Sequence, residues 1–162
     1  MSQSGLRFDL HTDPDTKVFS FALSRYADNL DDMSELFEAF SPVFTSSMRK
    51  QFTTQGSYGS GGWKPLSPAY KAWKLKNGLP GVVGTRYGHL KAAMTGGTGY
   101  TVEATKTTAS YGVGGGPSAD YGKHFDRTRP VIRIPAHEAT AWGKAAQKWM
   151  VEQARESGWG RL

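Results

Sequence analysis

Residues 33–52 read MSELFEAFSPVFTSSMRKQF, and this stretch decides the fold. An apolar side chain recurs at every third or fourth position, which is the spacing of one face of an α-helix. The members of this stripe are Met33, Leu36, Phe37, Phe40, Val43, Phe44, Met48 and Phe52. We expect a helix from Asn29 to about Thr54, capped by Asn29 or Asp31. Because Pro42 lies inside it, the pattern predicts a kink or two abutting helices.

Shorter helices are predicted on both sides of the long one, at residues 16–26, 67–76, 85–94 and 138–156, although Phe19 and Phe21 in the first would also suit a strand. The second begins at Ser67, whose side chain can cap a helix that has Pro68 at its first position. Asn77-Gly78 ends it. The last presents one largely apolar face, made of Trp142, Ala145, Ala146, Trp149, Met150 and Gln153.

Alternating apolar positions predict a small antiparallel sheet. Residues 100–104 and 109–113 form two strands joined by a turn near Lys106-Thr107, and further strands are expected over 6–10 and 131–134. The fold class is therefore α+β, with the sheet packed by the long helix and a C-terminal helix. The chain, residues 1–162, is expected to form a single domain. Flexible loops are predicted near the glycine-rich stretches 56–62 and 112–118.

The composition excludes several classes of site. The 162 residues include no cysteine, so disulfides and thiolate metal sites cannot form. No apolar run reaches the ~20 residues of a membrane-spanning helix, and the first residues lack the pattern of a signal peptide. We therefore expect no membrane partner and synthesis in the cytoplasm.

Charge is distributed unevenly along the chain. The net charge is +6, but residues 1–38, 39–102 and 103–162 carry −5, +8 and +3. No acidic residue lies between Glu38 and Glu103. This segment predicts a positive surface that faces an acidic partner, either a protein ring or the DNA backbone, or that simply keeps the protein soluble.

Motifs for catalysis are absent from the sequence. No Gly-x-Ser-x-Gly or P-loop pattern occurs, and Pro117 follows the glycine run 112–116 where a phosphate-binding helix would start. His124, Asp126 and His137 could form a metal site in space, which would make a metal-dependent hydrolase, but ordinary hydrogen bonding is the simpler interpretation. We predict no catalytic, cofactor-binding or metal-binding residues and no enzymatic activity.

Aromatic and basic side chains alternate between residues 63 and 91. Such mixing suits either single-stranded nucleic acid or a protein interface, whereas the pair Tyr70 and Trp73 could equally belong to the core. Trp63 follows a glycine-rich loop and precedes Pro65, so we choose it as the first interface anchor, with Trp149 as a core residue. The candidate interface residues are Trp63, Lys64, Tyr70, Lys71, Lys74, Arg86, Tyr87 and Lys91.

A series of short motifs in the same region resembles the phage virion morphogenesis (tail completion) family. Members carry an F…G…W-x-P-L-S…Y…K block, which here corresponds to Phe52, Gly56, residues 63–67, Tyr70 and Lys74. They also carry a T-G-x-L turn, which here corresponds to a lengthened turn over residues 85–90. Residues 119–125 resemble the family's Y-A…H-Q…G segment. Arg129-Pro130 is similar to its R-P-F element, with Val131 in place of phenylalanine.

The resemblance implies a structural role in a tailed-phage virion. Such a protein completes the tail or joins tail to head as a ring of subunits, with a hexamer as one stoichiometry. It would contact other tail or neck proteins, with DNA passing through the ring without sequence-specific binding. The alternative from the residues alone is a nucleic-acid-binding module that uses residues 63–91.

Overall fold

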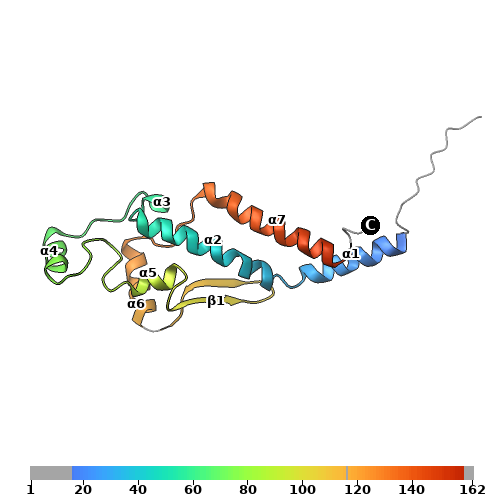
Figure 1. Cartoon of the computed structure of the whole chain (residues 1–162), viewed down its shortest axis with the longest axis horizontal. Helices are drawn as coiled ribbons and strands as arrows, with labels where there is room; N and C mark the ends of the chain where they lie inside the picture. The colour runs from blue at the N-terminus through green and yellow to red at the C-terminus, as the bar shows by residue number, and fades with distance from the viewer. Residues whose placement is uncertain (1–15, 116, 159–162) are drawn as a thin grey trace, which may run out of the picture.

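The computed structural model describes residues 16–115 and 117–158, which form an elongated α+β structure (Figure 1). Its elements are α1 (Thr16–Leu30), α2 (Ser34–Thr53), α3 (Ser57–Ser60), α4 (Pro68–Lys76), α5 (His89–Met94), β1 (Tyr100–Ala104), β2 (Ala109–Val113), α6 (Pro117–Thr128), the 3-10 turn η1 (Ala136–Glu138) and α7 (Ala139–Glu156). The strand predicted over residues 6–10 lies outside the described residues.

The long helix α2 begins at Ser34, later than predicted. The Asp32 carboxylate accepts a hydrogen bond from the Ser34 amide at 3.1 Å, while α1 continues to Leu30. The predicted caps, Asn29 and Asp31, are therefore wrong. Two abutting helices are also wrong, because α2 continues through Pro42. Pro42 lies on the exposed side of α2, and its missing N–H removes one hydrogen bond of the helix.

The apolar stripe of α2 lies at the centre of the fold, as the sequence predicts. Figure 1 shows α7 along one side of α2 and the β1–β2 hairpin along the other. The buried cluster combines this stripe with residues from five other segments: Phe44, Met48, Phe52, Trp63, Val83, Leu90, Met94, Phe125 and Val131. Trp149 of α7 is buried, as expected.

The hairpin packs its aromatic face against α2. The two strands have the predicted bounds, and their antiparallel register pairs Val102 with Tyr111. The Phe44 ring lies 5.5 Å from that of Tyr111 and 6.4 Å from that of Tyr100. The Tyr100 hydroxyl also forms a 2.8 Å hydrogen bond with Ser41 Oγ. A two-stranded sheet is marginal by itself, so these contacts with α2 stabilise it.

Two helices occupy stretches that the sequence assigns to loops. Residues 57–60 form α3, and Pro117 begins α6, so neither glycine-rich stretch is wholly loop. The helix predicted from residue 85 begins only at His89, because Gly88 before it has a left-handed φ of 86°. The Ser67–Lys76 prediction is confirmed, with Ser67 Oγ accepting from the Tyr70 amide.

The strand predicted over residues 131–134 is wrong. Its backbone amides have no neighbouring strand to bond: those of Val131 and Ile132 donate to Asp126 Oδ1, at 2.7 and 3.4 Å. Val131 is buried in the core, whereas Ile132 and Ile134 are exposed. Residues 131–134 therefore form an irregular connection from α6 to α7, and Val131 is the residue that anchors it in the core.

A buried carboxylate fastens the start of α7 to α2. Glu138 is only 6 % exposed and accepts hydrogen bonds from Ser47, Tyr58 and Lys50, the last at 2.9 Å. Burial raises the pKa of Glu138, but the three hydrogen bonds together outweigh burial, so its pKa lies below the ordinary value. The ionised form is thus the one that stabilises the fold.

We expect Glu138→Gln to destabilise the protein near neutral pH by about 1–2 kcal/mol, because the charged acceptor is lost. Because the pKa of Glu138 is lower in the folded than in the unfolded protein, its carboxylate stabilises the fold at pH values above the unfolded pKa of about 4.3. This stabilisation is lost as the pH falls through the folded pKa. Urea unfolding at about pH 7 and about pH 3 should therefore show the difference from wild type shrinking at the lower pH. An equal difference at both would contradict this account.

Candidate functional site

Trp63 belongs to the core and not to a free surface. Its side chain is 5 % exposed, and its ring meets those of Phe52 and Phe125 edge-on at 5.2 and 5.3 Å. The indole Nε1 donates a 2.8 Å hydrogen bond to the Pro130 carbonyl. A Cβ at Gly56 would lie 2.4 Å from the indole, so only glycine allows this approach. The expectation of an exposed anchor at Trp63 is therefore wrong.

Lys74 is buried as well, with 2 % of its surface exposed. Its ammonium donates to the carbonyls of Val82 and Thr85, at 2.8 and 2.9 Å, which holds the segment after α4 against the helix. Burial, and secondly the nearby Arg86, lower the pKa of Lys74. A partner cannot reach this ammonium, which corrects its assignment as an interface residue.

Three of the remaining candidates, Lys64, Tyr70 and Arg86, line an open groove of about 480 Å3 between the start of α4, residues 84–86 and α6. We call it the cationic groove and define it by Lys64, Ser67, Tyr70, Arg86, Tyr121 and Arg129. Three of these six side chains are cations, and they come from three separate segments. No aspartate or glutamate is among the described residues that line the groove.

Aromatic rings hold the groove's two arginines in place. The Arg86 guanidinium lies 5.3 Å from the Trp73 ring centre and 5.0 Å from that of Tyr87, and Trp73 stacks on Tyr70 at 5.6 Å. Arg129 lies 5.6 Å from the Phe125 ring. Cation–π contacts occupy the faces of a guanidinium and not its N–H donors; Arg129 uses its Nε–H on the Lys64 carbonyl, which leaves its terminal N–H groups to meet an anion.

A tyrosine hydroxyl adds a neutral donor to the same surface. Burial raises the pKa of Tyr121 above its ordinary value and Tyr70 adds to the increase, while Arg129 and Arg86 oppose it. Tyr121 therefore stays protonated at neutral pH and can donate a hydrogen bond. Carboxylate and phosphate oxygens are the natural partners of such a set of donors.

The predicted interface residues divide into three groups. Lys64, Tyr70 and Arg86 line the groove, and Tyr87 lies beside it against Arg86. Lys71 and Lys91 are exposed but do not line it. Trp63 is buried and does not line the groove, whereas Lys74 is among its lining residues but is only 2 % exposed, with its ammonium bound to two carbonyls.

Sequence reasoning missed Tyr121 and Arg129 as site residues. Both come from the α6 region, more than fifty positions after Lys64, and only folding brings them to the groove. The available signal was their place in the family-like stretches at 119–125 and 129–130.

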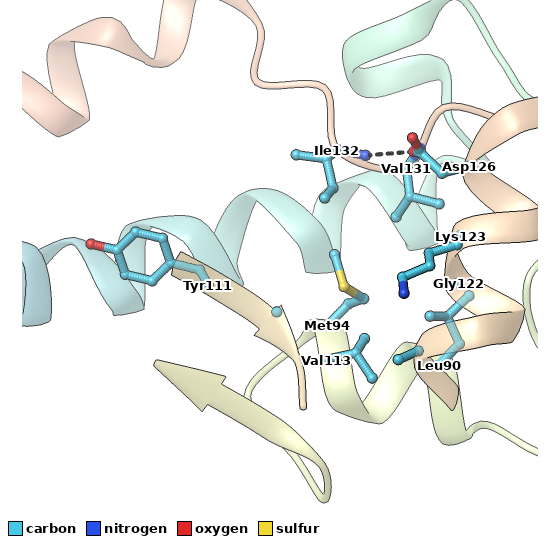
Figure 2. Close-up of a pocket in the computed structure, with 11 residues that line it drawn as sticks. Leu90, Met94, Tyr111, Val113, Gly122, Lys123, Asp126, Val131 and Ile132 are labelled. Carbon is cyan, nitrogen blue, oxygen red and sulfur yellow. Dashed lines mark hydrogen bonds between the residues drawn. The ribbon is translucent and has the colours of Figure 1, made fainter. Parts of the chain in front are cut away.

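A second hollow, of about 290 Å3, is apolar (Figure 2). Leu90, Met94, Val113 and Val131 surround it, and Lys123 lies at its edge. It exists because residues 112 and 122 are glycines; a Cβ at the latter would meet Leu90 at 3.2 Å. Its volume is at the lower end of ligand pockets, and it gathers no matching set of polar groups. The cationic groove is therefore the better candidate site.

The candidate metal ligands His137 and Asp126 take part in ordinary contacts. His137 Nε2 lies 3.1 Å from the Tyr58 hydroxyl, and Asp126 is occupied by the amides of residues 131 and 132. Among residues 16–115 and 117–158, no three histidine or acidic side chains are grouped so that they could hold a metal ion. None of the helices in these ranges is long and apolar enough to cross a bilayer.

Comparison with known proteins adds no relative. The chain matches no family model, and neither curated proteins nor solved structures give a match. The resemblance to virion morphogenesis motifs therefore remains a hypothesis, supported by the residues that carry it.

We expect Trp63→Ala to destabilise the fold by about 3–5 kcal/mol, because it removes a buried indole and leaves a cavity. Trp73→Ala is the matched control: this tryptophan lies in the same region but is 41 % exposed. Its loss should cost far less stability. Thermal and urea unfolding of the two purified variants measure the difference, and comparable stability of both would place Trp63 outside the core.

Proposed function

We propose that this protein is a structural subunit of a tailed-phage virion, which completes the tail or joins tail to head as part of a ring. The observation that carries the proposal is that the family-like motifs, spread from residue 52 to residue 131, converge on one network of contacts. They therefore act together as the signature of one folded unit, although each motif is short.

The aromatic and glycine positions of the motifs form the centre of this network. Phe52 and Trp63 pack edge to edge, and Gly56 leaves space for the indole. Phe125 closes the other side of the tryptophan, whose Nε1 bonds the Pro130 carbonyl. Phe52 and Trp63 of the first block are thus neighbours of Phe125, from the segment 119–125, and of Pro130.

The polar positions of the motifs fix the surrounding backbone. Ser67 caps α4, and Lys74 binds the carbonyls of the loop that leads to Thr85. Gly88 supplies the left-handed conformation before α5. These roles are architectural, which agrees with a subunit whose task is assembly and not catalysis.

The charge layout also supports assembly. Residues 1–38 are net acidic and residues 39–102 are net basic, a division that suits contact between unlike surfaces of neighbouring subunits. We propose a homo-oligomeric ring, with a hexamer as one stoichiometry, in the tail or neck of a virion assembled in the host cytoplasm. Its further partners would be other tail or neck proteins.

A second candidate function is nucleic-acid binding, favoured by the cationic groove itself. Three cations with neighbouring tyrosines and an exposed tryptophan, and no lining carboxylate, are the features of a surface that follows a phosphate backbone and stacks bases. This interpretation uses the groove but not the acidic part of the chain.

The structural role predicts closed rings of the purified protein in electron micrographs, because contacts between unlike surfaces form a ring when the rotation between neighbouring subunits divides a full turn. It also predicts a small, fixed number of copies in virions that have been purified free of assembly intermediates. Quantitative mass spectrometry of such virions provides the count. Complete absence from the virion would contradict the proposal.

The nucleic-acid role predicts binding to short single-stranded DNA that weakens steeply with salt. If the three groove cations contact three phosphates, a plot of log binding constant against log salt concentration has a slope of about −2. Arg86→Glu should make this slope shallower by about 0.7. Fluorescence anisotropy at two salt concentrations measures both quantities. Undetectable binding at low salt would eliminate this second candidate.

A further inference from the structure

The molecule carries an acidic surface that complements the groove. It consists of Asp28, Asp31, Asp32, Glu35 and Glu38, at the turn between α1 and α2, and we call it the acidic corner. All five side chains are exposed, and no lysine or arginine occurs between residues 28 and 38. In the described part of the chain, none of the five forms a salt bridge.

At the corner, Lys106 lies near enough to Asp32 to interact with it electrostatically, whereas the cations of the groove have no such acidic neighbour among its lining residues. Among the residues that the structure describes, Lys64, Arg86 and Arg129 form no salt bridge. Each surface thus concentrates charge of one sign on an exposed part of the protein. Such an arrangement is electrostatically unfavourable unless a partner neutralises it.

The two surfaces cannot meet within one copy. The acidic corner lies at the first turn of α2, while the groove lies beyond its last turn, on the side of α4 (Figure 1). The intervening helix has 20 residues and is therefore about 30 Å long. Their complementarity can be satisfied only between molecules.

We propose that the cationic groove of one copy receives the acidic corner of a second copy. The inference rests on the proposed structural function and names the surfaces by which its subunits meet. Because the two surfaces differ, each copy keeps one of each for a further neighbour, which produces a closed ring or a filament.

Exposed aromatic and apolar side chains provide the contact area that charges alone do not. Ion pairs at a surface contribute little, so the anchors must be apolar. Tyr87 is 63 % exposed beside the groove, and Trp73 is also accessible there. On the other surface, α1 leads into the acidic corner and exposes Phe21, at 66 %, and Leu23.

A second copy explains more of the structure than DNA does. Nucleic acid would use the groove but would be repelled by the acidic corner, and it would leave the exposed apolar residues of α1 unused. A second copy uses the groove, the corner and both apolar margins in one contact. DNA is accordingly an outcome of the test and not part of the proposal.

Paired charge reversals test the contact. Arg86→Glu alters only the groove and Asp31→Lys only the corner; both side chains are exposed, so the fold should be retained. Sedimentation velocity over a range of concentrations should show each variant associating at least about tenfold more weakly than wild type, a change of about 1.4 kcal/mol. Lys144→Glu, an exposed reversal on α7, is the matched control and should associate like wild type.

Mixing the two variants gives a more specific result. The unaltered corner of the Arg86→Glu copy can enter the unaltered groove of the Asp31→Lys copy. An equimolar mixture should therefore regain association that neither variant shows alone. A general loss of stability or solubility would not be restored in this way.

Three results would overturn the proposal: a wild-type protein that stays monomeric at all concentrations, association that Arg86→Glu leaves unchanged, or no recovery in the mixture. Single-stranded DNA binding that Arg86→Glu abolishes while self-association persists would assign the groove to nucleic acid and overturn it as well. The copy number in purified virions is independent of these measurements. It therefore separates failure of this contact from failure of the structural role.

Discussion

The packing of Trp63 against α2 is the interaction on which the rest of the structure depends. Its indole fills the space between Phe52 and Phe125, and its one polar atom bonds the Pro130 carbonyl. The segment after α3 and the end of α6 are thereby brought together at the end of α2. A single buried side chain thus connects parts of the chain that are 67 positions apart.

The cationic groove is a consequence of that packing. Lys64 follows the tryptophan and Arg129 precedes the proline, so the indole's hydrogen bond places these two cations side by side; Arg129 Nε also donates to the Lys64 carbonyl at 2.9 Å. Like charges are thus brought together by the burial of their apolar neighbours. Because no carboxylate lines the groove, these cations give it a positive field that attracts an anionic partner.

The wrong predictions share a physical origin. A short apolar run over 131–134 is consistent with a strand, but a strand needs a partner whose amides and carbonyls it can bond, and here Asp126 takes that place. Trp63 lies two positions before Pro65, which is typical of the boundary between two elements. Its burial depends instead on the segments that pack against it. Lys74 carries a charge that would ordinarily be exposed to water, but hydrogen bonds to two loop carbonyls allow its burial. In each case the deciding partner lies more than four positions away along the chain, from five for Asp126 and Val131 to 67 for Trp63 and Pro130, so helical or strand periodicity does not reveal it.

Local patterns determined most of the elements. Helical spacing identified the stripe of α2, Ser67-Pro68 and Asn77-Gly78 set the ends of α4, and alternation with a turn set the hairpin, because neighbours within four residues control these features. The sequence also determined the sign and grouping of the charges. Only the tertiary structure decided which aromatic residues are core and that Tyr121 and Arg129 join Lys64 and Arg86 in one groove. Burial and convergence depend on contacts between distant residues, which no local pattern specifies.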